Sequence, residues 1–153
     1  MIEKTTEELN KILGSTHPGN ISNFLTNNED SLINDEHYFA AYMKELIKKN
    51  NMLQQEVFLN ADIPERYGYK LLSEEKHTRQ RDVILRICYA AKFTLAETQK
   101  ALKIYGMPEL YARIPRDAAL MICFNERPGS VLEVNTYLKK NHFLPLRSSG
   151  TQE

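Results

Sequence analysis

The side chains in this 153-residue sequence that could do chemistry are mostly basic, and they stand near its middle. Arg66 and Lys70 come first, and Lys76, Arg79 and Arg81 follow in a short polar segment. Guanidinium and ammonium groups are the side chains that bind phosphate oxygens most strongly. Basic residues of this kind suit a phosphate backbone, whereas Glu74 and Glu75 in the same segment would be repelled by it, so the two effects partly cancel.

The histidines and cysteines do not predict a metal site. His17, His37, His77 and His142 show no i, i+4 pair and no Cys-x-x-Cys partner. Cys88 and Cys123 stand inside the apolar strings Ile87-Cys88-Tyr89 and Ile122-Cys123-Phe124, which favours buried, reduced thiols. We expect neither a metal nor any other cofactor.

The sequence also lacks the usual signatures of catalysis. It contains no glycine-rich phosphate loop, no nucleophile elbow and no paired metal ligands, so we do not expect an enzyme and predict no catalytic residue. With 42% hydrophobic and 26% charged residues, the chain can bury one substantial core. It has no apolar run long enough for a membrane span and Met1 begins no signal peptide, which predicts a cytoplasmic protein without membrane contact.

Charge is distributed unevenly although the net charge is zero. Residues 1–36 hold two lysines against seven acidic residues, a balance of −5, so the remainder carries +5. A capping-box spacing from Thr5 to Glu8 predicts a short helix over 5–13, and 14–35 is predicted to be a loop or weakly ordered linker. We interpret 1–36 as a helix and acidic arm.

The stretch 53–72 predicts two short helices joined by a tight corner. Val57, Ala61 and Leu71 supply a shared apolar face, which is interrupted at Asp62-Ile63-Pro64, and the second helix is predicted over 64–72. A supporting helix over 37–50 precedes the pair.

These residues resemble the phage-repressor-like helix-turn-helix class, also called the XRE or Cro/cI class. The resemblance covers about 37–91, and the motif that carries it consists of Gln54 at the opening of the first helix, the corner, and the segment from Pro64 to Lys70. It implies a DNA-binding protein, usually a homodimer, whose second helix enters the major groove. The residues that it implies for base reading are Glu65, Arg66, Tyr69 and Lys70, and those for phosphate contact are Gln54, Lys76, Arg79 and Arg81.

Three positions depart from the pattern of that class. Phe58 stands where alanine is usual, Asp62 where glycine is usual, and Gly68 where a branched residue is usual. The resemblance implies that Phe58 and Gly68 face each other, so a volume swap is predicted. Asp62 is expected to take a left-handed conformation, which aspartate tolerates better than most residues.

The second half of the sequence contains a duplication. Residues 81–89 match 116–124 and residues 94–103 match 130–139, at offsets of 35 and 36. Capping boxes are predicted at Thr94 and Ser130, and Asp82 and Asp117 are interpreted as favourable charges at helix starts. The predicted fold is all-α, with an arm (1–36), a repressor-like helix-turn-helix (37–80) packed with two repeated helical hairpins (81–146), and a flexible tail (147–153).

Two functions remain open at this point. The first is a sequence-specific transcriptional regulator that binds double-stranded DNA as a homodimer. The alternative is a non-enzymatic interaction module that retains the fold without DNA binding and contacts a protein partner through the acidic arm or the hairpins.

Overall fold

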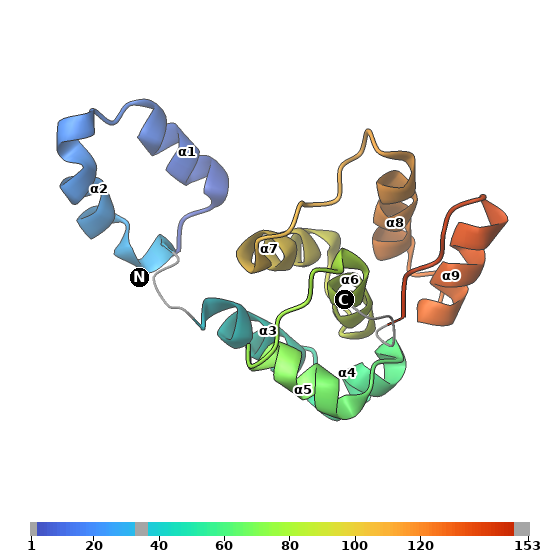
Figure 1. The fold of residues 1–153 in the computed structure, drawn as a ribbon. Helices are drawn as coiled ribbons and strands as arrows, with labels where there is room; N and C mark the ends of the chain where they lie inside the picture. Colours follow the sequence, from blue (N-terminus) through green and yellow to red (C-terminus); the bar gives the residue numbers. More distant parts are fainter. Residues whose placement is uncertain (1–2, 33–36, 149–153) are drawn as a thin grey trace. The chain divides into compact units, whose positions relative to one another are not determined.

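A computed structural model describes residues 3–32 and 37–148, and within these ranges the chain is helical with no strand. The all-α prediction is therefore confirmed. The chain divides into two compact units, Met1–Glu36 and His37–Glu153, which we describe separately (Figure 1). No helix in the described residues is long and apolar enough to cross a membrane.

The first unit contains α1 (Thr6–Gly14), α2 (Ile21–Asn27) and two short 3₁₀ turns, Pro18–Asn20 and Glu29–Ser31. The predicted capping box is confirmed, since Glu8 N–H donates to Thr5 Oγ1 at 3.1 Å and Thr5 N–H donates to Glu8 Oε2 at 3.0 Å. The prediction of a loop over 14–35 is wrong for most of its described length. Phe24 is buried on α2 and gives this polar segment an apolar contact that favours a helix.

The second unit is built from seven helices in its described part: α3 (Tyr38–Lys49), α4 (Gln54–Ala61), α5 (Glu65–Leu72), α6 (Arg81–Ala90), α7 (Leu95–Tyr105), α8 (Pro115–Glu126) and α9 (Val131–Lys140). Helix α6 lies among the others and packs on α4, α7 and α9. Every residue from Asp82 to Ala90 is buried, as expected for a helix that is apolar on nearly all sides.

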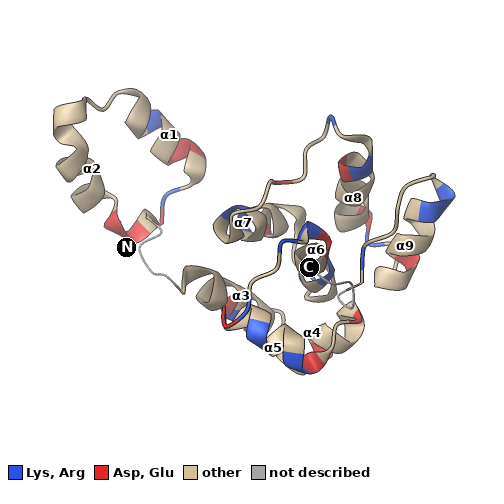
Figure 2. Cartoon of the chain, in the orientation of Figure 1, with Lys and Arg blue, Asp and Glu red and all other residues tan. Residues whose placement is uncertain are grey.

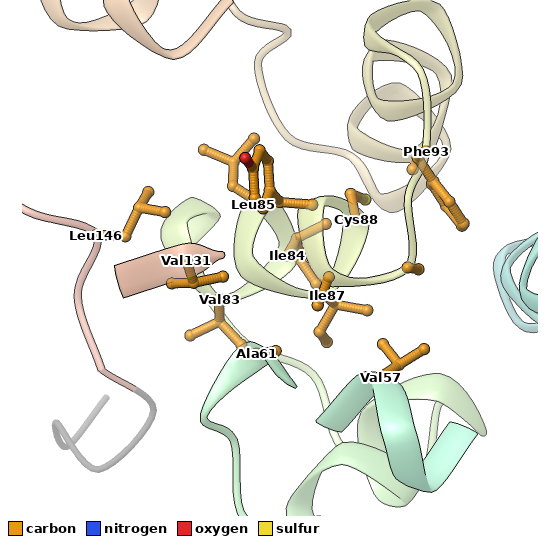
Figure 3. Packing of buried hydrophobic residues seen from close by; sticks show 14 of the residues in the cluster. Val57, Ala61, Val83, Ile84, Leu85, Ile87, Cys88, Phe93, Val131 and Leu146 are labelled. Atoms are coloured by element: carbon orange, nitrogen blue, oxygen red, sulfur yellow. The ribbon is translucent and has the colours of Figure 1, made fainter. Parts of the chain in front are cut away.

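The contact between α4 and α6 joins the α4–α5 pair to the rest of the core. Val57 and Ala61 lie one turn apart on α4 and face Ile87 and Val83, which lie one turn apart on α6 (Figure 3). All four side chains are fully buried. Burial of this kind contributes about 1.5–3 kcal/mol for each large aliphatic side chain, so the orientation of α4 is set by the core.

Five helices of this unit end in the same way. A residue in the left-handed conformation follows each helix, and the N–H of the next residue bonds back to a carbonyl five positions earlier, as in the Schellman motif. The left-handed residues are Asn51, Asp62, Lys92, Gly106 and His142. The apolar residues that follow them are Met52, Ile63, Phe93, Met107 and Phe143, with N–H···O distances of 2.8–3.1 Å. Each connection thus begins with an apolar residue that packs on the core.

The predicted hairpins are present as α6–α7 and α8–α9. Their capping boxes are confirmed at Thr94 and Ser130, and Cys88 and Cys123 are both buried free thiols, as predicted. The hairpins pack reciprocally, because α6 contacts α9 and α7 contacts α8.

Arg86 on α6 is a buried charge that holds two distant parts of the backbone. It donates to the carbonyl of Ala61 at 3.1 Å and to those of Leu146 and Arg147 at 2.7 Å each. Burial lowers the pKa of Arg86, while Asp62 and Asp82 oppose that shift. The prediction of a flexible tail from 147 is therefore wrong for Arg147, whose N–H also donates to Asp82; residues 149–153 lie outside the described part.

Candidate nucleic-acid interface

The corner between α4 and α5 depends on Asp62. Its φ and ψ of 56° and 51° are left-handed, as predicted, and the following Ile63 is buried. Helix α5 begins at Glu65, one residue later than predicted, with Pro64 as its N-cap and the Pro64 carbonyl accepting from Gly68 N–H at 2.9 Å. The corner therefore sends α5 away from α4 with its first turn in solvent.

Phe58 and Gly68 face each other across the two helices, as predicted. A Cβ atom placed on Gly68 would lie 2.6 Å from Phe58 Cγ and 2.7 Å from Cε1, which is closer than real Cβ contacts. The Phe58 ring is fully buried in the space that the absent side chain leaves. The volume swap keeps α4 and α5 packed, and it fixes which face of α5 points outward.

The four residues predicted for base reading all lie on α5. Glu65 and Arg66 are exposed on its first turn, and Lys70 is half-buried near its end. Tyr69 is 42% exposed, and its ring packs edge-on against Phe58 with centroids 5.0 Å apart. Figure 2 shows both basic and acidic residues along this helix. The outward face of α5 can therefore offer donors from Arg66 and Lys70 and an acceptor from Glu65.

The residues predicted for phosphate contact differ in their exposure and in their contacts within the chain. Lys76 and Arg79 are exposed in the segment after α5, and Gln54 is half-buried at the first position of α4. Arg81 is instead bound inside the chain. Its guanidinium pairs with Asp117 at 2.5 Å and also reaches the carbonyls of Pro108 and Glu109.

Glu74 has structural partners at the start of α3 that the sequence did not predict. Its carboxylate accepts from Ala40 N–H at 3.4 Å and lies 3.5 Å from His37 Nδ1, at the start of α3. A carboxylate at a helix N-terminus compensates the unpaired N–H groups and the positive end of the dipole. The Glu74 carboxylate therefore stabilises the start of α3. Lys76 and Arg79, in the same segment, remain exposed.

A groove lies beside the first turn of α5, and its lining is more apolar than the outward face of that helix. It has a volume of about 270 Å³ and is lined by Gln55, Glu56, Leu59, Ile63 and Glu65. Leu59 is 78% exposed, and Leu53 at the start of α4 is also exposed. The lining of the groove therefore combines the apolar side chains of Leu59 and Ile63 with the carboxylates of Glu56 and Glu65. Leu59, a leucine within the first helix, is the sequence feature that could have indicated this groove.

A larger cavity lies where α4, α6 and the start of α9 meet. It has a volume of about 610 Å³ and is lined by Asn60, Tyr89, Ala90, Lys92, Arg127, Gly129, Ser130 and Val131. The Arg127 guanidinium lies over the Tyr89 ring and donates to the carbonyls of Tyr89 and Phe93. Burial lowers the pKa of Arg127. This arginine joins the loops of the two hairpins, which explains its position without a ligand.

Residues 3–32 and 37–148 contain no cluster of side chains that could hold a metal ion. No family model, curated protein or solved structure matches this chain. Its function is therefore inferred from the geometry of its own side chains.

Proposed function

We propose that this protein is a sequence-specific DNA-binding transcriptional regulator of the repressor-like helix-turn-helix type, with α5 as the recognition helix. The main support is the outward face of α5. Arg66, Tyr69 and Lys70 reach solvent there, while Gly68, Leu71 and Leu72 face the core. A short helix held in this way can enter a major groove, whose width accepts one helix.

The chemistry of each side chain suggests its role. Arg66 is the best candidate for guanine, because its two N–H groups match the O6 and N7 acceptors, and Glu65 could accept from the cytosine amino group. Lys70 and Tyr69 would contact neighbouring bases. Lys76, Arg79 and Gln54 would bind phosphates and fix the register of the protein on the duplex. Arg81, which is paired with Asp117, would hold the scaffold behind them.

A selection from random duplexes at near-physiological salt would test the proposal. We expect the selection to enrich one motif. On that site, Arg66→Ala should lose about 1–3 kcal/mol and relax the preference at one base pair. Arg79→Ala should weaken binding to all sequences alike and reduce the slope of log K against log salt by about one.

Lys140 provides a control for both substitutions. It is exposed at the end of α9, outside the proposed interface, so Lys140→Ala should leave both affinity and salt slope unchanged. If the selection enriches no motif and the wild-type protein shows no salt-dependent binding, the DNA-binding proposal is wrong.

The groove beside α5 favours a second candidate function, an interaction module for a protein partner. Leu59 and Ile63 give it an apolar lining, and Glu56 and Glu65 add two carboxylates to that lining. These carboxylates would repel a phosphate backbone but suit a segment with an apolar anchor and basic flanks. In that case Leu59→Glu would remove binding to such a segment, and Arg66→Ala would not weaken it.

A further inference from the structure

The duplication allows each face of α8 to be compared with the matching face of α6. Val83 and Ile87 on α6 correspond to Ala118 and Ile122 on α8, at the offset of 35. The α6 residues are fully buried under Val57 and Ala61 of α4. On α8, Ile122 is 49% exposed and Ala118 is half-buried. The face that receives a helix in the first hairpin is thus open in the second.

The open face continues as a stripe along α8. Ile114, at the N-cap, lies one turn before Ala118 and is 47% exposed, and the Ala118 N–H donates to the Ile114 carbonyl at 2.9 Å. Residues at i, i+4 and i+8 lie on one side of a helix, so Ile114, Ala118 and Ile122 form a row. We call this row the α8 stripe. It has isoleucine at both ends and a small residue at its centre, and 118–125 contains no charged residue.

We propose that the α8 stripe is an interface with a second copy of this chain. Two α8 helices would cross antiparallel at Ala118, so that Ile114 of each copy packs against Ile122 of the other. A two-fold contact needs a surface that is complementary to itself, and a large-small-large row meets that condition when one helix is reversed. The small central residue lets the two backbones approach, as Ala61 does between α4 and α6.

Charge also favours an antiparallel second copy as the occupant. Arg113 lies before the stripe and Glu126 lies after it, and both are exposed. Reversing one helix brings the arginine end of each copy toward the glutamate end of the other, whereas a parallel arrangement would place like charges together. The inference concerns assembly and holds whether or not the protein binds DNA.

Sedimentation equilibrium of the full chain across micromolar concentrations would test the interface. We expect a reversible dimer in the wild-type protein. Ile122→Glu introduces two charges per dimer and should raise the dimer dissociation constant about tenfold or more. Leu59→Glu is the matched control, because it places the same charge on an exposed apolar position of α4 and should leave the constant within about twofold of the wild-type value.

A cross-linking variant tests the geometry without adding a charge. In Ala118→Cys the two introduced thiols would meet at the two-fold axis, and mild oxidation should produce a covalent dimer, while the native Cys88 and Cys123 stay buried. Thr136→Cys, on an exposed position of α9, is the control and should remain monomeric on a denaturing gel. A wild-type protein that is monomeric throughout, or a dimer that neither the Ile122 nor the Ala118 variant affects, overturns the proposal.

Discussion

Arg81 and Asp117 form a bidentate ion pair between the two hairpins, with Nη2 2.5 Å from Oδ1 and Nη1 3.1 Å from Oδ2. Arg116 and Asp82 form the same pair in the opposite sense, at 3.1 and 3.0 Å. Each pair also holds the segment that follows one hairpin. The contacted backbone groups are the carbonyls of Pro108, Glu109, Leu144 and Pro145 and the N–H groups of Tyr111 and Arg147.

Loss of Asp117 should be costly, because its carboxylate is only 1% exposed and accepts from both Arg81 and Tyr111. We expect Asp117→Ala to lower the free energy of unfolding by about 3–5 kcal/mol, since it leaves a partly buried guanidinium without its counter-ion. Adding Arg81→Ala should then cost much less than Arg81→Ala costs alone. Urea denaturation of the four proteins gives the coupling energy, and additive losses would show that the pair does not act as a unit.

The contact between Phe58 and Gly68 predicts a compensating pair of substitutions. Phe58→Ala should lower the free energy of unfolding by about 3–5 kcal/mol through lost burial and a cavity. Combining it with Gly68→Ile should recover much of that loss, because the new side chain points into the vacated space. Gly68→Ile alone should be strongly destabilising. Thermal or urea unfolding compares the three variants, and a double variant less stable than Phe58→Ala would contradict the proposed compensation.

Lys92 offers a stabilising substitution. Its φ of 65° is left-handed, which costs a non-glycine residue about 1–2 kcal/mol, whereas glycine adopts it without this penalty. Lys92→Gly should therefore raise the free energy of unfolding by about 1 kcal/mol. Gly106→Ala at the matching end of α7, where φ is 86°, should lower it by a similar amount. If both substitutions changed the free energy of unfolding in the same direction and by the same amount, the left-handed backbone conformation would not be the explanation.

The two cysteines should be unreactive in the folded protein. Burial raises the pKa of both the Cys88 and the Cys123 thiol, so the thiolate needed for reaction is depleted at neutral and mildly alkaline pH. We expect a soluble disulfide reagent to label neither thiol at pH 8 until denaturant is added, when both react. Rapid labelling of either one without denaturant would mean that its hairpin is open to solvent.

The sequence predicted the helices of the second unit well, because their apolar residues recur at helical spacing and their capping boxes are local. The facing of Phe58 and Gly68 was also predictable, because the resemblance to the repressor-like class implies that these two positions face each other, and their sizes then suggest a volume swap. Helix α2 was missed because its sequence is polar and asparagine-rich, and a single buried residue, Phe24, supplies its contact. Weak local propensity was overridden by packing.

The pairing of the repeated arginines and aspartates could not be predicted from one hairpin. Each Arg-Asp dipeptide opens a helix, and the sequence alone explains Asp82 and Asp117 as favourable charges at helix starts. The arginine that pairs with each aspartate lies in the other hairpin. Each aspartate also accepts a hydrogen bond from a backbone N–H group, and a contact to the backbone requires no particular residue type that the sequence could reveal. Among the residues predicted for phosphate contact, the pairing of Arg81 with Asp117 was not foreseen for the same reason.

The reversed ion pairs imply an origin for the double hairpin. Each pair takes its arginine from one hairpin and its aspartate from the other, so two separate but identical hairpins could form both pairs across a two-fold axis. A gene for one hairpin would already encode a symmetric dimer. Joining two copies in one chain replaces an encounter between molecules by an effective concentration in the millimolar range. Within one chain, the sequence of each hairpin can also change independently of the other. Arg86 in the first hairpin, for example, corresponds to Met121 in the second.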